Sequence, residues 1–295
     1  MFTWIAIAVF SQFVSALTVF IDKYVLVSKE GIKHPAAFAF YTMMLSGVIV
    51  ILLPFGVVSL PSTNVFLFSL LSALFYMSGL LFLYRALREL SVTDVIPITA
   101  AFGAMTTGIL ASLFLTHDLT VNALPGFILL IIGTVLIYCF CFSWRLFFLT
   151  VSAGVFIGAS TFAVKLVFEA TGVANALFWP LIMNVLVALV VLAPTRFFAI
   201  KDGITSSSSG AKWMVIISKA LGGLSFFLTF IAIYLGSVSI VSAIGGLQLI
   251  FLFMLTPLVT RRIGIFQGEL SRRTVVLKVT GTLAIVLGLA ALFIL

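Results

Sequence analysis

Residues 3–28 read TWIAIAVFSQFVSALTVFIDKYVLVS, an apolar stretch whose only charged residues are Asp22 and Lys23 near its end. A bilayer core about 30 Å thick needs about 20 apolar residues in a helix, so this stretch predicts a membrane-spanning helix. No Lys or Arg precedes it, and it is longer than the apolar part of a signal peptide. We therefore expect it to remain in the protein as the first span.

The composition of the whole chain has the same character as this stretch. Of its 295 residues, 63% are hydrophobic and 8% are charged, whereas soluble domains carry about 25% charged residues. Its 16 Lys and Arg and 8 Asp and Glu are too few to cover a soluble core of this size. The composition excludes a soluble fold and predicts an all-α integral membrane protein with the lipid bilayer as its main partner.

Cutting the chain at its charges and at its Pro, Gly and Ser clusters divides it into predicted spans. Two cuts, at Pro54 to Pro61 and at Gly236-Ser237, rest on turn chemistry alone, which leaves nine or ten spans, and we take ten. The longest predicted loop, Arg196 to Lys212, contains a flexible TSSSSG run. The predicted transmembrane helices are residues 3–28, 34–54, 64–88, 93–116, 120–142, 146–169, 175–194, 211–236, 240–259 and 275–294.

The cations predict which side of the membrane each connection faces. Lys and Arg lie in or beside the odd-numbered connections and are missing from the even-numbered ones. Cytoplasmic loops carry the excess of Lys and Arg, so both termini are expected on the non-cytoplasmic side of a bacterial inner (plasma) membrane. The formal net charge of +8 then needs no nucleic-acid partner, and no basic run with interleaved aromatic residues suggests one. These cations are Lys29, Lys33, Arg85, Arg88, Arg145, Arg196, Lys201, Lys212, Arg261, Arg262, Arg272 and Arg273.

The two halves of the chain resemble each other in order, which predicts a first repeat at residues 1–143 and a second at 144–295. Each repeat has five spans, and an odd number places the copies upside down relative to each other in the bilayer. Two inverted five-helix repeats suit alternating access to a central site. The matches are Phe20-Ile21-Asp22-Lys23 with Phe162-Ala163-Val164-Lys165, Phe40-Tyr41 with Phe178-Trp179, Ala86 and Ser91-Val92-Thr93 with Ala232 and Ser237-Val238-Ser239, and Gly126 and Gly133 with Gly281 and Gly288.

These features resemble the EamA-type carriers of the drug/metabolite transporter superfamily. The resemblance covers nearly the whole chain: its size, its ten spans, the late lysines of the first and sixth spans, Pro97, and Gly268-Glu269-Leu270-Ser271 before the last span. It implies a central cavity between spans 1–4 and 6–9, with spans 5 and 10 more peripheral. The chain departs from the family at Phe40-Tyr41, where many relatives place an Arg. It departs again at Thr116-His117-Asp118, where they usually show Gly-Glu, and relatives usually keep both termini in the cytoplasm.

Uncharged polar side chains at central depth are the candidates for substrate binding. They offer directed hydrogen bonds at a lower insertion cost than charged groups, although each also suits a bond between neighbouring helices. Lys165 joins this set as a group for a substrate carboxylate, with an ion pair to Glu169 one turn later as the alternative. The predicted binding residues are Gln12, Tyr41, Tyr76, Thr106, Lys165, Trp179, Asn184 and Gln248.

Four charged residues within or near the spans are candidates for gating or coupling. An ionised side chain at mid-membrane costs about 2.5–3.5 kcal/mol on insertion scales, so each needs a partner or a purpose. Asp22, Lys23, Glu169 and Lys219 form this set. Snorkelling to the interface is the alternative for Lys23. Proton coupling would need one of three carboxylates, Asp22, Asp94 or Glu169, and facilitated diffusion or exchange remain open.

The sequence favours a secondary transporter over an enzyme. It has no P-loop, and its two histidines, His34 and His117, are isolated, so no metal or other cofactor is expected. The predicted function is movement of a small metabolite, such as an amino acid or a related polar or amphipathic compound, with export expected by analogy with the family. A channel or an accessory membrane subunit is the alternative, followed by an intramembrane enzyme acting on a lipid headgroup.

Overall fold

The computed structural model describes residues 3–28, 31–32, 34–114, 124–138, 143–205, 207–235, 244–263 and 272–294. Regular structure in these residues is helical, and they contain no strand. Within these described ranges, seven helices, some formed by consecutive elements, are long and apolar enough to cross a membrane. They are α1 (Thr3–Val27), α2 (Pro35–Leu45) with η1 (Ser46–Phe55), α3 (Thr63–Glu89), α4 (Val92–Phe114), α6 (Trp144–Ala170), α7 (Val173–Val187) with its continuation to Thr195, and α10 (Ser209–Leu235).

The other three predicted spans also coincide with helices. These are α5 (Leu124–Tyr138), α12 (Leu247–Ile263) and α13 (Arg272–Ile294). The described apolar segments of α12 and α13 are shorter, Leu247–Thr256 and Val279–Gly288. An integral multi-pass membrane protein is therefore confirmed with seven candidate spans, and the full set of ten stays a prediction.

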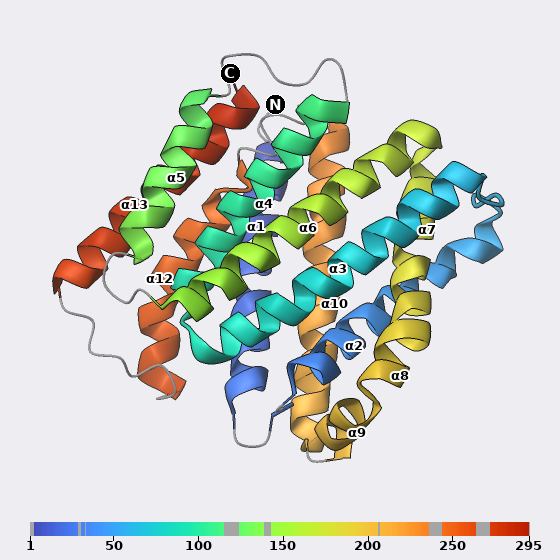
Figure 1. Cartoon of the computed structure of the whole chain (residues 1–295), viewed down its shortest axis with the longest axis horizontal. Helices are drawn as coiled ribbons and strands as arrows, with labels where there is room; N and C mark the ends of the chain where they lie inside the picture. The colour runs from blue at the N-terminus through green and yellow to red at the C-terminus, as the bar shows by residue number, and fades with distance from the viewer. Residues whose placement is uncertain are drawn as a thin grey trace.

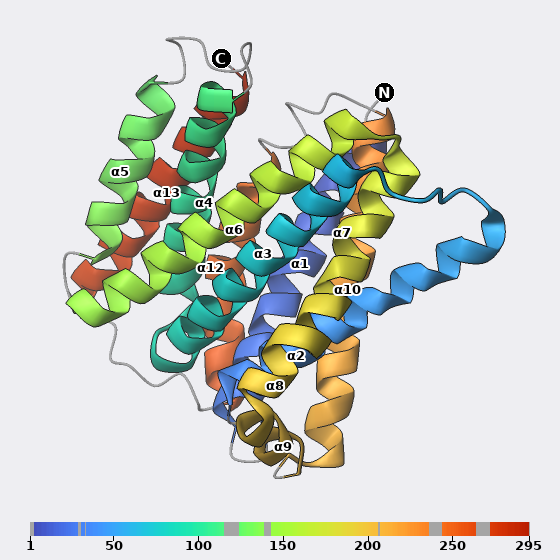
Figure 2. The same ribbon diagram turned by 45° about the vertical axis from the view of Figure 1, so that its right-hand side comes forward.

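The second span differs from one continuous α-helix. After Leu45 the chain tightens into the 3₁₀ helix η1, which ends at Gly56 with φ 66° in the left-handed region that favours glycine. A 3₁₀ helix rises about 2.0 Å per residue instead of 1.5 Å, so this stretch is longer than an α-helix would be. No residue of η1 is buried. Its beginning lies against α7, where a Cβ on Gly47 would be 3.3 Å from Val185, and its far end extends away from the other helices (Figure 2).

The predicted loop from Arg196 to Lys212 is wrong for much of its length. A π-helical turn, η3 (Ala188–Leu192), and the short α8 (Ala193–Thr195) lead into α9 (Phe197–Thr205). Gly203 of α9 lies against α2, where a Cβ on Gly203 would be 2.6 Å from the Cβ of Ala37. The helix α9 therefore packs on α2. Gly203 allows the close approach, and Phe197 and Ile200 supply apolar side chains on the side of Phe40.

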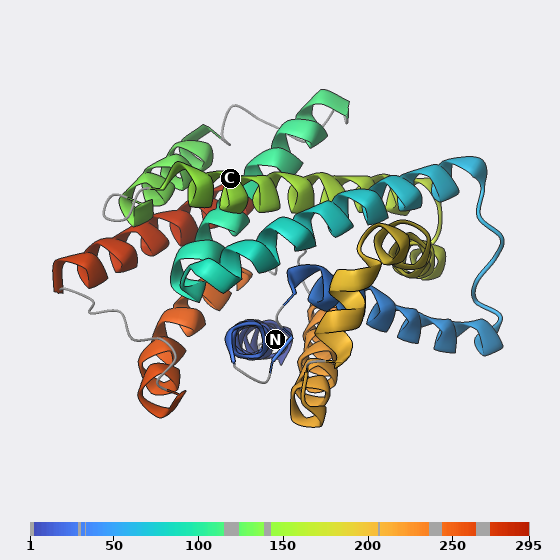
Figure 3. The same cartoon turned by 60° about the horizontal axis from the view of Figure 1, so that its bottom comes forward.

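The packing of the long helices concentrates at a few crossings. α3 and α4 both cross α6, α1 packs along α10, and α5 packs along α13 (Figures 1 and 3). Glycines allow close approach at these crossings, because Gly79 faces Ile157 and Gly158 faces the backbone of Gly103.

The end of α1, the turn between α3 and α4, and α9 lie at the lower end of the molecule in Figures 1 and 2. The start of α1 and the end of α13 lie at the opposite end. Exposed Arg85, Arg88, Arg196 and Lys201 belong to the lower elements, which we call the cationic end. The predicted cut at Gly236-Ser237, His117 and Asp118 lie outside the described residues, as do the Gly268-Glu269-Leu270-Ser271 stretch and the side chains of Arg261, Arg262, Arg272 and Arg273.

Candidate functional site

An ion pair joins α1 to α10 near the cationic end. The Nζ of Lys219 lies 2.6 Å from Oδ2 of Asp22, and their side chains are only 14% and 9% exposed. The hydroxyl of Ser218 donates a second hydrogen bond to the other oxygen of Asp22. Buried charges are costly unless they are paired and hydrogen-bonded, and here both conditions are met.

Side chains from α2 and α3 complete the surroundings of Lys219. Its ammonium also donates to the hydroxyl of Tyr84 at 3.2 Å and lies 4.8 Å from the centre of the Phe38 ring. The Tyr84 hydroxyl is 3.0 Å from that of Thr42, and the rings of Phe38 and Tyr84 pack edge to face. A cation–π contact of this kind is stronger in a site that contains little water.

We call this set the charged cluster. Its members are Asp22 from α1, Phe38 and Thr42 from α2, Tyr84 from α3, and Ser218 and Lys219 from α10. Three of its helices belong to the predicted first repeat and one to the second. The cluster therefore ties the two halves of the chain together at the cationic end.

Lys23 has a different role from its neighbour Asp22. It is buried, and its ammonium donates to the carbonyls of Leu87 and of Leu90, the latter at 2.8 Å, where α3 ends. A cation at a helix C-terminus satisfies carbonyls that lack partners within the helix and offsets the helix dipole. Asp94 of α4 interacts with Lys23 electrostatically. Lys23 thus stabilises the C-terminus of α3, and both its predicted role in gating and the alternative of snorkelling stay predictions.

The seam between α1 and α10 continues from the charged cluster toward the opposite end of the molecule. Ser11 and Thr229 are 3.0 Å apart between hydroxyl oxygens, and the Ser225 hydroxyl donates to the carbonyl of Ser11 at 2.8 Å. The predicted binding residue Gln12 is buried in this seam and donates to the Ser11 hydroxyl at 3.4 Å. Hydrogen bonds hold this interface along much of its length.

A second polar contact lies where α3 crosses α6. The hydroxyls of Ser72 and Ser160 are 3.1 Å apart, and each also donates to the carbonyl of the other residue, at 3.3 and 3.0 Å. Both residues are buried. This crossing contains no charged side chain at its centre, in contrast to the charged cluster.

The other predicted binding residues lie on several helices. Tyr76 of α3 interacts electrostatically with Asp22 and Lys219, which places it near the charged cluster. Trp179 of α7 donates its indole N–H to the carbonyl of Ser59, in the connection that precedes α3. Thr106 of α4 lies against α6 at Gly158.

The remaining residues of the predicted sets differ in burial. Asn184 of α7 is buried, Tyr41 of α2, Lys165 of α6 and Gln248 of α12 are half-buried, and Glu169 in the last turn of α6 is exposed. From the gating set, the structure thus pairs Asp22 with Lys219, places Lys23 at the C-terminus of α3 and leaves Glu169 elsewhere. A common cavity for the predicted binding residues stays a prediction.

Sequence reasoning missed Phe38, Thr42, Tyr84 and Ser218. Each is an ordinary residue in an apolar helix, and only Ser218 carried a signal, since it adjoins Lys219. Among the described residues, no group of three or more His, Cys, Asp or Glu is placed to hold a metal ion. The candidate site consists of charged, hydroxyl and aromatic side chains.

Comparisons with known proteins agree on the fold and on the family of the first half. A solved structure described as "Crystal structure of protein" matches 97% of this chain and 98% of its own, with a TM-score of 0.52 and 17% sequence identity. A likeness at that identity speaks for the fold alone. No curated protein matches the sequence significantly. The model of the EamA-like transporter family matches residues 2–139, in agreement with the resemblance of the sequence to drug/metabolite transporters.

Proposed function

We propose that the protein is a secondary transporter that moves a small metabolite by rocking two inverted five-helix repeats, 1–143 and 144–295, about a central site. The match of residues 2–139 to a transporter family supports transport as the activity. The single observation that carries the mechanism is that α1 crosses α10 as α6 crosses α3, at equivalent positions of the two repeats.

The register of these two crossings supports the repeat. Counting back from the matched Lys23 and Lys165 pairs Thr18 with Ser160, and counting back from the matched Ala86 and Ala232 pairs Ser72 with Ser218. The Ser218 hydroxyl lies 3.4 Å from the Thr18 carbonyl, and the Ser72 hydroxyl lies 3.3 Å from the Ser160 carbonyl. Exchanging the halves turns one contact into the other.

The glycine contacts between α5 and α13 are related by the same exchange of the two halves. A Cβ on Gly133 would meet the carbonyl of Gly281 at 2.5 Å, and a Cβ on Gly288 would meet that of Gly126 at 2.9 Å. In the sequence repeat Gly126 matches Gly281 and Gly133 matches Gly288. Two antiparallel helices related by a two-fold axis in the membrane plane would pair in this way.

The ion pair breaks this symmetry, which suggests a gate. At the positions equivalent to Asp22 and Lys219 the other crossing has Val164 and Ala73. The charged cluster then acts as the gate of the cationic, cytoplasmic end, and opening that end requires Asp22 and Lys219 to separate.

The proposed substrate is an amino acid or a related polar or amphipathic compound, moved outward. Its proposed binding residues are the polar side chains within the predicted spans: Gln12, Tyr41, Tyr76, Thr106, Lys165, Trp179, Asn184 and Gln248. Gln12 and Tyr76 have the best support, because Gln12 lies in the α1–α10 seam and Tyr76 near the charged cluster.

Cysteine accessibility tests alternating access. In a Cys139→Ser, Cys141→Ser background, Gln12→Cys and Gln248→Cys are each exposed to a membrane-impermeant reagent from one side at a time. We expect labelling from either side, with a compound from a metabolite panel changing the ratio. Failure of both cysteines to react under every condition would exclude a shared aqueous pathway, and flux into liposomes that does not saturate would indicate a channel.

The gate is tested separately with a neutral pair. Asp22→Asn combined with Lys219→Met removes both charges and leaves no unpaired one, so the cationic end should open more often. We expect labelling of Gln12→Cys from that end to rise about tenfold, which corresponds to a shift of about 1.4 kcal/mol. Arg145→Gln, which breaks only an exposed ion pair, is the control and should leave labelling unchanged.

A further inference from the structure

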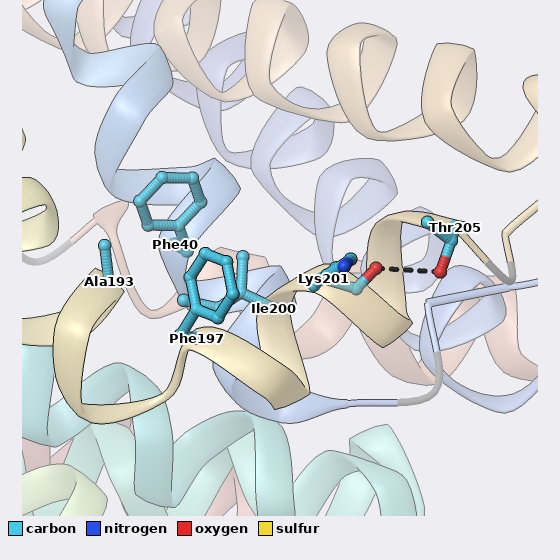
Figure 4. Close-up of a pocket in the computed structure, with 6 residues that line it drawn as sticks. All are labelled: Phe40, Ala193, Phe197, Ile200, Lys201 and Thr205. Atoms are coloured by element: carbon cyan, nitrogen blue, oxygen red, sulfur yellow. Dashed lines mark hydrogen bonds between the residues drawn. The ribbon is translucent and has the colours of Figure 1, made fainter.

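A cavity that no part of the proposed transport cycle uses lies between α2, α8 and α9. Its volume is about 300 Å³, at the lower bound of small-molecule sites, which run from about 300 to 1,000 Å³. Figure 4 shows Phe40 of α2 facing Phe197 and Ile200 of α9, with Lys201 and Thr205 farther along α9. The walls are therefore apolar, with a cationic side chain toward one end.

The position of α9 favours contact with lipid. The helix has nine residues, too few to cross a bilayer, and it lies at the cationic end of the molecule (Figure 1). Phe197 and Phe198 are 55% and 79% exposed, while Lys201 on the same helix is also exposed. Exposed aromatic side chains beside a cation are typical of helices that lie in the membrane interface.

The charges around the cavity favour an anionic occupant. The helix α9 and the residue just before it contain two cations, Arg196 and Lys201, against one anion, Asp202. An apolar cavity in a membrane interface suits an acyl chain, and a cation at its margin suits a phosphate group. A zwitterionic headgroup would gain less from this arrangement, because its own positive charge offsets the attraction.

We propose that this cavity is a binding site for an anionic phospholipid. One acyl chain packs between Phe40 of α2 and Phe197 and Ile200 of α9, and the headgroup phosphate pairs with Lys201. Arg196, exposed at the start of α9, adds positive charge to the same surface. The lipid comes from the leaflet at the cationic end.

The site adjoins the charged cluster through α2. Phe40 faces the cavity, whereas Phe38 and Thr42 of the same helix contact Lys219 and Tyr84. Gly203 seats α9 directly on Ala37 of α2. A lipid in the cavity therefore contacts the helix that supplies two members of the charged cluster, so its presence would bias how readily the cationic end opens.

Lipid retention tests the proposal without any transport measurement. The purified protein is reconstituted with phosphatidylglycerol and phosphatidylcholine in equal amounts, released into mild detergent and weighed by native mass spectrometry. We expect one phosphatidylglycerol to remain bound more often than phosphatidylcholine. Each cation near an anionic surface contributes about fivefold, so Lys201→Gln should lower that preference about fivefold. Lys212→Gln, which changes a cation outside the cavity, is the matched control.

A second variant tests the acyl-chain part of the site. Ala193→Phe fills the cavity and should reduce retention of both lipids, with Ala193→Leu as a milder change should the larger side chain prevent folding. Equal retention of the two lipids by the unaltered protein would overturn the proposal. So would an effect of Lys212→Gln as large as that of Lys201→Gln, or unchanged retention in folded Ala193→Leu. None of these results depends on whether the protein transports a metabolite.

Discussion

The two ion pairs described here differ in their surroundings. Asp22 and Lys219 are nearly buried and share further hydrogen bonds with Ser218 and Tyr84. Arg145 and Glu89 lie 3.1 Å apart with side chains 73% and 36% exposed. Removing one partner of a buried pair leaves the other charge buried and uncompensated, which strongly destabilises the fold. An exposed pair contributes little to stability, because water solvates each charge when its partner is removed.

The buried ion pair leads to a prediction about stability. Asp22→Asn leaves the Lys219 ammonium without its counter-ion in a nearly dry site, so unfolding should require about 3–5 kcal/mol less free energy. Arg145→Gln should cost under about 1 kcal/mol. Thermal melting of the purified proteins in one detergent compares the two.

The neutral double variant provides the internal check on that prediction. Asp22→Asn combined with Lys219→Met should recover most of the stability that Asp22→Asn loses, because no buried charge remains unpaired. An Asp22→Asn melting temperature equal to that of Arg145→Gln would mean that water reaches Lys219 freely. In that case the charged cluster would not be a closed gate.

At the scale of the elements, glycine decides how closely the helices approach. Lipid is as apolar as the side chains, so helix association in a membrane depends on close packing and hydrogen bonds. α5 and α13 meet through Gly133, Gly281, Gly126 and Gly288. Gly223 of α10, by contrast, has no atom within 4 Å of where its Cβ would lie.

This contrast gives a matched pair of variants. Gly133→Ala places a methyl group 2.5 Å from the carbonyl of Gly281 and 2.9 Å from the amide of Ile285, both backbone atoms. The helices must move apart, at a cost of about 1–3 kcal/mol. Gly223→Ala should be neutral or stabilising by up to about 1 kcal/mol, because alanine favours helix. Thermal melting distinguishes them, and equal melting temperatures would argue against tight α5–α13 packing.

The contact between Ser72 of α3 and Ser160 of α6 should have a measurable coupling energy. A double-mutant cycle of Ser72→Ala and Ser160→Ala should give a coupling energy of about 0.6 kcal/mol, the average for hydrogen bonds between membrane helices. Ser78 instead donates to the carbonyl of Leu74 in its own helix at 2.9 Å. A cycle of Ser78→Ala with Ser160→Ala should therefore show no coupling, and coupling there would mean that these substitutions disturb the helices generally.

At the scale of the whole molecule, the charges divide the protein into two unlike ends. The end of α3, the start of α6 and α9 carry Arg85, Arg88, Arg145 and Lys201. Ser59 lies in the connection between η1 and α3 and accepts hydrogen bonds from Asn175 and Trp179 of α7. No cation adjoins it in the sequence. The distribution predicts that these two groups of residues face opposite sides of the membrane.

Labelling in cells tests that division. In the background without Cys139 and Cys141, Ser59→Cys should react with an impermeant reagent in intact cells, and Arg145→Cys only after permeabilisation. Both positions are exposed, so burial does not explain a failure to react. Reaction of both from the same side would contradict the proposed orientation and the inverted repeats with it.

The composition and the apolar runs of the sequence are enough to predict that the protein lies in a lipid bilayer and where its long helices form. Apolar runs in lipid have to satisfy their backbone hydrogen bonds internally, so they become helices almost wherever they occur. The span predicted at 64–88 is α3 (Thr63–Glu89), and the span predicted at 146–169 is α6 (Trp144–Ala170). The late lysines and the glycines of the repeat also pointed to the family whose model matches residues 2–139.

The packing of the helices, and no pattern in the sequence, establishes which charged side chains form ion pairs and which residues surround them. Asp22 and Lys219 are far apart in the chain, and no local pattern indicates that α1 and α10 pack together in the register that pairs them. Tyr84, Thr42 and Phe38 resemble any other residues of an apolar helix until the packing places them around one ammonium. Helix formation depends on near neighbours and on the solvent, whereas these contacts depend on the rotation and approach of whole helices, which the small residues at each crossing set collectively.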